Sequence, residues 1–266
     1  MMTDILAFGS GGLVGFILGL IGGGGSILAV PLLVYVVGVS QPHIAIGTGA
    51  LGVGLSAFGN LVQHARAHNV KWRCASVFAA AGVVGALLGA GLGKAFDGQK
   101  LLLLFGVLMI VIAAAMAWKK TSTGNPGVQL TSASAGRLLP RLIGYGLSVG
   151  SLSGFFGIGG GFLVVPGLIA ATDMPMIAAV GSSLVSVTAF GLTTAASYAF
   201  SGLIDWWLAA MFIAGGIAGG LAGARAARHL STGKETLRLI FAGLVAVVGV
   251  YVVTRGILTM TAAAAA

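Results

Sequence analysis

Two glycine-rich segments, at residues 19–33 and 154–168, hold the residues of this sequence that are best suited to chemistry. Glycine is a poor helix former, so each segment should interrupt one helix and begin another. The first residues of a helix have free N–H groups and a positive partial charge, and glycines let an anion approach the backbone. We therefore expect both segments to bind an oxyanion through peptide groups. The residues concerned are Gly22, Gly23, Gly24, Gly25 and Ser26 in the first segment and Gly157, Gly159, Gly160 and Gly161 in the second.

Small polar residues open the apolar span that follows each glycine-rich segment. Ile-Gly-Thr-Gly-Ala-Leu at 46–51 corresponds to Val-Gly-Ser-Ser-Leu-Val at 180–185. Their hydroxyls either donate to the same site or bond to the preceding helical turn, as Ser and Thr often do in membrane helices. Both interpretations stay open at this point. The candidate residues are Gly47, Thr48, Gly181, Ser182 and Ser183.

A second polar set lies near the ends of these two spans, at helical spacing. It forms either the polar face of a transport pathway or two helix ends that emerge among lipid headgroups. Asn60, Gln63 and His64 make up the first group, and Thr194, Ser197 and Tyr198 occupy the matching positions in the second.

Charged residues are kept out of the apolar spans. All five acids fall in loops or at span ends, so no buried carboxylate is expected to hold a cation or relay a proton. No span combines a nucleophile, a base and an orienting group, and the ATP-binding Gly-x-x-x-x-Gly-Lys-Ser/Thr pattern is absent, so we predict neither an enzyme nor an ATPase. The single Cys74 excludes an internal disulfide and a cysteine metal cluster. No metal and no cofactor is expected.

The elements that must position these residues are membrane helices. Of 266 residues, 58% are hydrophobic and only 7% are charged, and the mean hydropathy is +1.07. Such a chain cannot bury its apolar surface in a water-soluble globule, and its apolar runs are continuous rather than alternating. The sequence therefore predicts an all-α polytopic membrane protein. The net charge is +9, and the basic residues that produce it flank the apolar runs. This position indicates contacts with lipid headgroups rather than with nucleic acid.

The chain divides into two similar halves. We expect a first membrane repeat at residues 1–118, a polar linker at 119–141 and a second repeat at 142–266. Outside the glycines, Trp72 corresponds to Trp206 and Phe78 to Phe212 in a constant register, which indicates an internal duplication. Each half should contain one glycine-broken segment and three spans, near 44–63, 74–93 and 101–118 in the first half and near 177–200, 206–224 and 237–253 in the second.

The basic residues indicate how the broken segments run. If each crossed the membrane once, the 14 Lys and Arg residues would divide eight against six between the two sides. If each enters and returns, as a hairpin or re-entrant segment, they divide 11 against 3. Because basic loops stay in the cytoplasm, the second topology is favoured. It makes the two repeats inverted and puts both termini outside the cytoplasm.

The paired glycine-rich segments ending in Val-Pro, the Gly-Thr-Gly and Gly-Ser-Ser openings and the tryptophans Trp72 and Trp206 together resemble the sulfite exporter TauE/SafE family. The likeness covers nearly the whole chain except the linker and the terminal alanines. It implies a bacterial inner-membrane permease for small sulfur-containing or other organic anions, such as sulfite or organosulfonates.

Together these observations predict a secondary carrier of small anions that works by alternating access, with the two glycine breaks as opposed gates. Its partners would be a small oxyanion or organosulfonate and the lipid bilayer, and a homo-oligomer is compatible with the sequence. The alternative is a channel-like or assembly membrane protein without a transported substrate, whose glycines serve helix packing alone.

Overall fold

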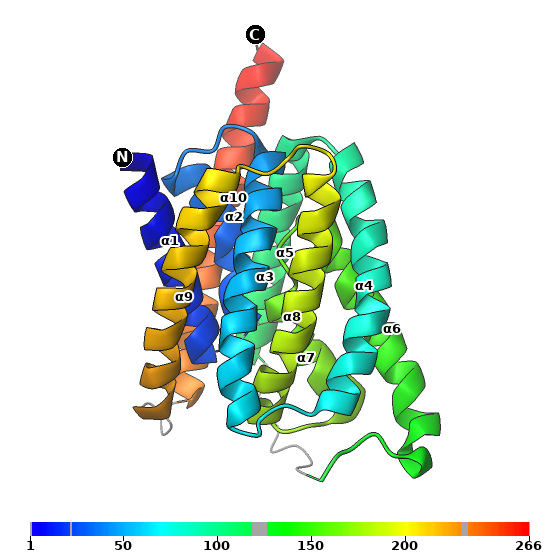
Figure 1. Cartoon of the computed structure of the whole chain (residues 1–266). Helices are drawn as coiled ribbons and strands as arrows, with labels where there is room; N and C mark the ends of the chain where they lie inside the picture. The colour runs from blue at the N-terminus through cyan, green and yellow to red at the C-terminus, as the bar shows by residue number, and fades with distance from the viewer. Residues whose placement is uncertain (1, 22, 119–126, 230–233, 266) are drawn as a thin grey trace.

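The computed structural model describes residues 2–21, 23–118, 127–229 and 234–265 (Figure 1). All regular structure in these ranges is helical, and no strand occurs in them. The elements are α1 (Met2–Ile21), the 3-10 helix η1 (Gly23–Leu28), α2 (Ala29–Pro31), the π-type turn η2 (Leu32–Val36), α3 (Pro42–Arg66), α4 (Trp72–Ala95), α5 (Gly98–Trp118), α6 (Ser132–Phe156), α7 (Gly161–Thr172), α8 (Met176–Ala199), α9 (Trp206–His229) and α10 (Lys234–Ala265).

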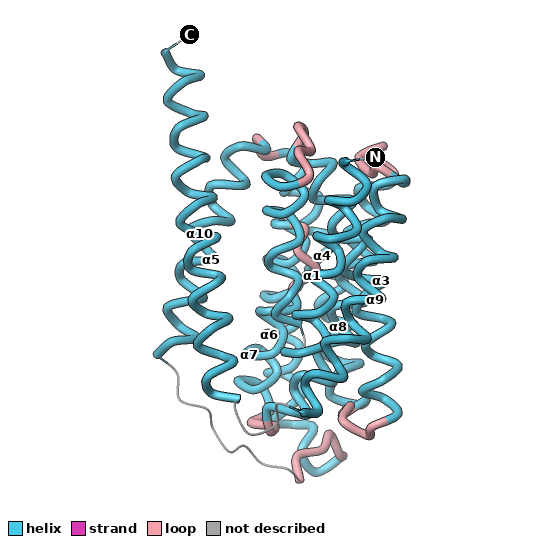
Figure 2. The backbone as a smooth tube through the Cα atoms, turned by 90° about the vertical axis from the view of Figure 1, so that its left-hand side faces the viewer, coloured by secondary structure: helices cyan, strands magenta, loops and turns pink. Residues whose placement is uncertain are grey.

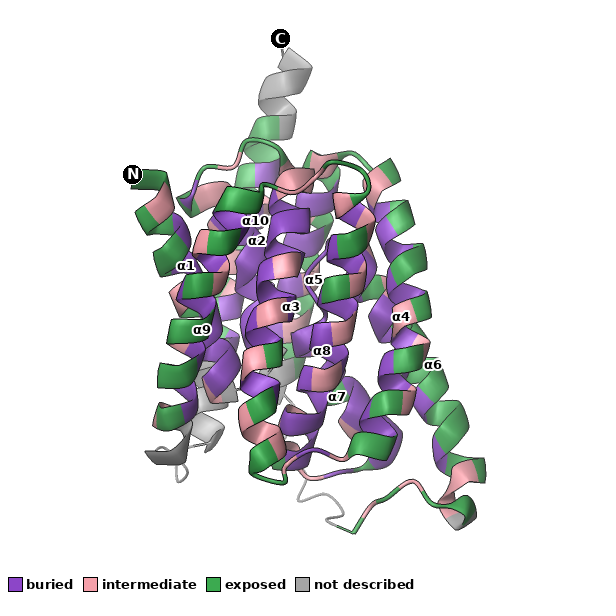
Figure 3. Cartoon of the chain, viewed as in Figure 1, coloured by how far each residue is buried: buried purple, intermediate pink, exposed green. Residues whose placement is uncertain are grey.

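Seven of the described helices are long and apolar enough to cross a membrane: α1, α3, α4, α5, α8, α9 and α10. A helix of 24 residues such as α4 is about 36 Å long, which exceeds a hydrocarbon core of about 30 Å. The buried residues gather on α2, α3 and α8 at the centre, whereas the outward faces of α4 and α9 are exposed (Figure 3). Leu88 and Leu92 on α4 are among the exposed apolar side chains, as expected of a surface that faces lipid. The all-α membrane fold predicted from composition is confirmed.

The first glycine-broken segment enters the bundle and returns to the end from which it came. Trp207 Nε1 donates to Asp4 Oδ1 at 3.0 Å, which joins the starts of α9 and α1. The N–H of Asp205 donates to Thr48 Oγ1 at 3.1 Å, which joins the start of α9 to the start of α3. Helices α1 and α3 therefore both begin at the upper end of Figure 1. The chain between them runs down as α1 and back up through η1, α2 and η2.

The second broken segment does the same from the opposite end. Arg73 Nη1 donates to the carbonyl of Leu130 at 3.4 Å, which fixes the start of α6 beside the start of α4. The N–H of Lys71 donates to Ser182 Oγ at 2.8 Å and brings the first turns of α8 to the same place. Helices α6 and α7 thus enter from the lower end and return to it (Figure 1). The two broken segments are hairpins that enter from opposite ends.

Helices of the two halves pack in exchanged pairs. Helix α1 packs against α9 and α4 against α6, while α3 packs on α8 and α5 on α10. Figure 2 shows α5 and α10 side by side, next to the remaining helices. Glycines bring the first two pairs together, because a Cβ on Gly15 would overlap the Gly216 carbonyl oxygen and one on Gly150 would overlap that of Gly82. These relations agree with an inverted repeat, which itself stays a prediction.

Two boundaries differ from the expectation. Residues 132–141, placed in the polar linker, form the first turns of α6, because Thr131 and Ser134 make a reciprocal capping box there. A polar, serine-rich sequence favours a loop, although Ser and Thr at the N-cap position also start helices. Helix α10 extends beyond Val253 to Ala265. Residues 119–126 of the linker lie outside the described residues, and the division into two repeats stays a prediction.

Candidate functional site

The second glycine break is a tight turn in the interior of the bundle. Helix α6 ends at Phe156, and Gly157, Gly159 and Gly160 then adopt positive φ angles of 65°, 64° and 69°. Only glycine takes this left-handed conformation without strain. A Cβ at Gly157 would also overlap the side chain of Ile46 on α3. The positive φ angles of these glycines therefore let the chain reverse its direction, and α7 begins at Gly161.

This turn leaves a row of peptide N–H groups without acceptors. Gly157 and Ile158 donate to Gly154 and Ser153, and Leu163 and Val164 both donate to Gly160. The N–H groups of residues 159–162, in contrast, have no hydrogen-bond acceptor anywhere in the described part of the chain. All four residues are buried. Buried N–H groups are rarely left unpaired because each costs about 1–3 kcal/mol, and an oxyanion is the ligand that fits the amino end of a helix.

Ser153 places a hydroxyl beside the same turn. Its side chain is fully buried, and its Oγ has no hydrogen-bond partner among the described residues. A Cβ built on Gly160 would lie 2.7 Å from Ser153 Oγ, so the hydroxyl borders the amino end of α7. Sequence reasoning missed this residue because its repeat partner, one position before Gly19, is Leu18. The turn therefore combines four peptide donors with one free hydroxyl.

A face of α8 completes this region. Ser186, Phe190, Thr194 and Tyr198 recur every four residues and so share one side of the helix. The Phe190 ring lies 3.2 Å from the position of a Gly160 Cβ, which turns this face toward the break. The hydroxyls of the other three residues are buried and have no partner in the described chain. Two of the predicted pathway residues, Thr194 and Tyr198, thus lie on the face that borders the turn.

The remaining member of the α8 pathway set, Ser197, contacts a lysine. Its carbonyl accepts a hydrogen bond from Lys94 Nζ at 3.0 Å, and the same ammonium reaches Ser201 Oγ at 3.0 Å. Lys94 Nζ also lies 5.8 Å from the centre of the Tyr198 ring. A cation therefore stands at the upper end of the polar α8 face.

Two of the predicted polar residues of α3, Asn60 and His64, share a corresponding face with Ser56 near the other end of the bundle. Ser56, Asn60 and His64 recur every four residues, and Ser56 Oγ, Asn60 Oδ1 and His64 Nδ1 are buried atoms without a partner among the described residues. Asn60 Nδ2 donates to the Ser56 carbonyl at 3.1 Å and borders Gly220 on α9. Gln63 is half-buried beside this face. The interior therefore holds two polar faces, one on each central helix.

The predicted hydroxyls at the starts of α3 and α8 form hydrogen bonds with backbone groups. Thr48 and Ser182 accept the loop N–H groups of Asp205 and Lys71, and Ser183 Oγ donates to the Val180 carbonyl at 2.7 Å. Gly47 and Gly181 let the same two loops approach, because a Cβ on Gly47 would overlap the Leu203 carbonyl oxygen and one on Gly181 that of Asn69. Thr48, Ser182 and the two glycines thus join helix ends to loops, whereas Ser183 bonds back to its own helix. Because Thr48 and Ser182 only accept in these contacts, donation of their O–H groups to a ligand stays a prediction.

The first glycine break is built differently from the second. Gly22 lies outside the described residues, and residues 23–28 form the 3-10 helix η1. Gly24, Gly25 and Ser26 are buried, and a Cβ on Gly25 would lie 2.5 Å from the Val14 carbonyl oxygen. The returning chain therefore packs closely on α1. Because η1 also packs against α7, the two breaks lie next to each other, and their returning segments run in opposite directions (Figure 1).

The described interior offers dipoles rather than charges. Asp97, Asp173 and Asp205 are exposed, and Asp4 is partly exposed near the start of α1. No three His, Cys, Asp or Glu side chains of the described chain gather at one place in a way that could hold a metal ion. A ligand bound at the second break would therefore meet peptide N–H groups and hydroxyls, with no carboxylate to repel an anion.

Comparisons with known proteins agree with the expected resemblance. The family model for the sulfite exporter TauE/SafE matches residues 7–252. A "Probable membrane transporter protein" of Xylella fastidiosa is 48% identical over 251 residues, covering 94% of this chain and 95% of the relative. The "Probable membrane transporter protein YunE" of Bacillus subtilis is 26% identical over 279 residues, covering 96% and 99% of the two chains. No solved structure matches the chain at a significant level.

Proposed function

Because this chain belongs to the sulfite exporter TauE/SafE family of multi-pass membrane transporters, and not to a family of enzymes, we propose that it is a secondary carrier for a small oxyanion. Sulfite and organosulfonates are the ligands we propose, since the family name refers to sulfite and the interior offers donors without a countercharge. The single observation that carries this proposal is the row of four buried, unpaired N–H groups at residues 159–162.

The oxyanion would bind at the amino end of α7. Its oxygens would accept hydrogen bonds from the N–H groups of residues 159–162 and from Ser153 Oγ, whose burial and lack of partner support this role. Hydrogen bonds to a charged group contribute about 1.5–3 kcal/mol each, and the dipole of α7 adds to them. Such donors offset part of the cost of removing one negative charge from water.

Two hairpins that enter from opposite ends support an alternating-access cycle. In this cycle, movement of one inverted repeat against the other would open the site to one side of the membrane at a time. The basic end, where Arg66, Lys71 and Arg73 lie, would face the cytoplasm, so that both termini would be outside it in the bacterial inner membrane. With no carboxylate in the described interior, a proton would travel on a weakly acidic substrate such as bisulfite rather than on the protein.

The competing interpretation gives all the glycines a packing role. The close approach of Gly15 to Gly216 and of Gly150 to Gly82 is indeed packing. The second break differs, because packing does not require three positive φ angles or a row of unpaired N–H groups. This difference favours the carrier over a channel-like or assembly protein without a substrate.

Flux measured in proteoliposomes tests the proposal. Purified protein would be reconstituted and assayed with radiolabelled sulfite, sulfoacetate and taurine, with carboxylates of similar size as controls. Saturable, protein-dependent flux of at least one sulfur oxyanion is expected, with binding of the same anion detected as a thermal shift. Protein that is folded by hydrogen exchange, yet neither transports nor binds any of these anions, would contradict it.

A further inference from the structure

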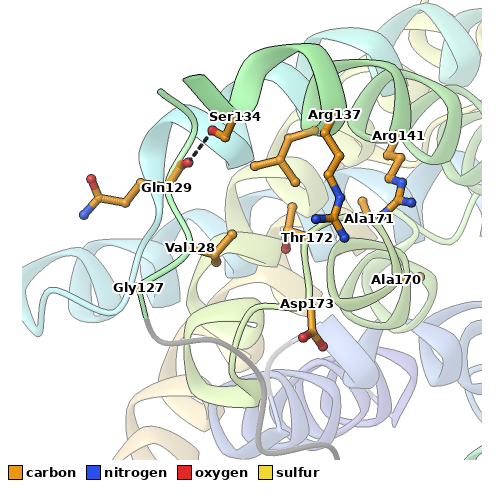
Figure 4. Close-up of a pocket in the computed structure, with 11 residues that line it drawn as sticks. Gly127, Val128, Gln129, Ser134, Arg137, Arg141, Ala170, Ala171, Thr172 and Asp173 are labelled. Carbon is orange, nitrogen blue, oxygen red and sulfur yellow. Dashed lines mark hydrogen bonds between the residues drawn. The ribbon is translucent and has the colours of Figure 1, made fainter. Parts of the chain in front are cut away.

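A polar pocket opens at the lower end of the bundle, where α6 begins and α7 ends (Figure 4). Its volume is about 350 Å³, and residues 127–129, the first turns of α6 and the last residues of α7 line it. It stands apart from the interior site, at the far end of the 12-residue helix α7. At 1.5 Å per residue, the two ends of α7 are about 18 Å apart.

Two arginines make this pocket positively charged. Arg137 and Arg141 lie one helical turn apart on α6, and Figure 4 shows both side chains reaching toward the end of α7. Both are exposed, and neither makes a hydrogen bond or an ion pair with any described residue. Guanidinium groups are planar donors that match the oxygens of phosphate and sulfonate groups. The pocket therefore presents two positive charges with their donors unused.

The other polar groups around the pocket do not neutralise these charges. Thr172 Oγ1 is already used, because it donates to the Leu168 carbonyl at 2.7 Å and accepts from the N–H of Met174 at 3.3 Å. Asp173 ends α7 with a φ of 59°, and Figure 4 shows its carboxylate directed away from the guanidinium groups. Neither arginine donates to a carbonyl at the carboxyl end of α7, so capping of that helix does not account for the pair.

We propose that this pocket binds a tetrahedral oxyanion, held by Arg137 and Arg141 at the face of the bundle that carries most of the basic residues. The ligand chemistry is a phosphate or sulfonate group with at least two free oxygens. This group could come from either of two sources, a soluble anion bound at the carboxyl end of α7 or the phosphate of an anionic lipid headgroup at the membrane surface. The proposal does not rest on the interior site or on transport.

The rate at which each arginine is chemically modified, with and without ligand, tests whether an oxyanion binds at this site. The protein would be embedded in nanodiscs and treated with phenylglyoxal, and the modification of each arginine followed by peptide mass spectrometry. One arm uses phosphatidylcholine with and without inorganic phosphate at constant ionic strength, so that general screening does not change. The other arm replaces the lipid by phosphatidylglycerol and omits phosphate. Arg66, which is exposed at the same end and is not part of the pocket lining, is the control within the same molecule.

In at least one arm, Arg137 and Arg141 should react more slowly while Arg66 does not change. A ligand at about ten times its Kd leaves about one site in ten free, so the modification slows about tenfold. Protection by phosphate identifies a soluble anion, and protection by phosphatidylglycerol identifies a headgroup. Arg137→Gln should remove the protection of Arg141, and Asp173→Asn should strengthen it because a negative charge in the pocket lining that repels the anion is lost. Equal rates with and without ligand in both arms, or equal protection of Arg66, would overturn the proposal.

Discussion

Replacing Ser153 by alanine separates binding from folding more cleanly than any glycine substitution does. Ser153 Oγ is buried and has no partner among the described residues, so its removal breaks no hydrogen bond within the described chain. Loss of an unsatisfied buried polar group is neutral or stabilising. We therefore expect the melting temperature of Ser153→Ala to equal or exceed that of the wild type.

The affinity for the oxyanion, in contrast to the melting temperature, should fall in Ser153→Ala. If Ser153 Oγ donates to a charged oxyanion, its loss removes about 1.5–3 kcal/mol, which corresponds to a roughly tenfold to hundredfold weaker affinity. The assay is the concentration dependence of sulfite flux in proteoliposomes, together with the thermal shift produced by sulfite. A rise in KM of at least about tenfold is expected, with an unchanged amount of folded protein.

Ser148→Ala is the matched control on the same helix. Ser148 is exposed, and its Oγ donates to the Gly144 carbonyl at 2.9 Å within α6, away from the break. Its substitution should leave KM within about twofold, since surface changes of this kind are worth about 0.5 kcal/mol or less. An unchanged KM for Ser153→Ala, or a KM that rises only together with a fall in melting temperature, would refute the reasoning.

Three further substitutions give distinct outcomes. Gly160→Ala should abolish sulfite flux and destabilise the protein by about 1–2 kcal/mol, because φ is 69° there. Gly59→Ala, within α3 and with open space at its Cβ position, should leave flux unchanged and should not lower stability; denaturation and flux assays compare the two variants. Gly15→Ala should lower the yield of folded protein, seen by size-exclusion chromatography, because its Cβ overlaps the Gly216 carbonyl oxygen; normal yield would contradict the close packing of α1 on α9. Asp205→Asn should leave the substrate-dependent pH change in vesicles intact, since among the described residues this exposed carboxylate accepts only the Leu208 N–H at the start of α9. Abolition of the pH change would show that the protein carries the proton.

The course of the chain through the membrane could be predicted from the sequence because the physics involved is local. Continuous apolar runs identify spans, and four glycines in such a run identify a break. The count of 11 basic residues against 3 favours segments that enter and return, and the contacts that join the starts of α1 and α3 to α9, and those of α6 and α8 to the start of α4, agree with this course. The sequence predicts that the second repeat begins at residue 142, whereas α6 begins at Ser132. The difference arises because a capping box in a polar sequence resembles a loop.

The details of the site depended on tertiary contacts that a sequence does not contain. The sequence predicts Thr48 and Ser182 as donors to a ligand, but it does not show that their oxygens also accept N–H groups from loops that are distant in sequence. Ser153 was overlooked because the repeat comparison places Leu18 at the same position. The two breaks also differ in backbone geometry, although their sequences are alike, since Gly25 packs on α1 whereas Gly159 and Gly160 adopt positive φ angles.

Selenite, which is the selenium counterpart of sulfite, allows the most direct test of the proposed oxyanion site. Crystals grown with selenite would be measured at the selenium absorption edge, so that the anomalous signal locates the anion without ambiguity. The account predicts an anomalous peak at the amino end of α7, within hydrogen-bond distance of the N–H groups of residues 159–162 and of Ser153 Oγ. Selenite flux with a peak only elsewhere in the interior, such as beside Asn60 on α3, would contradict it.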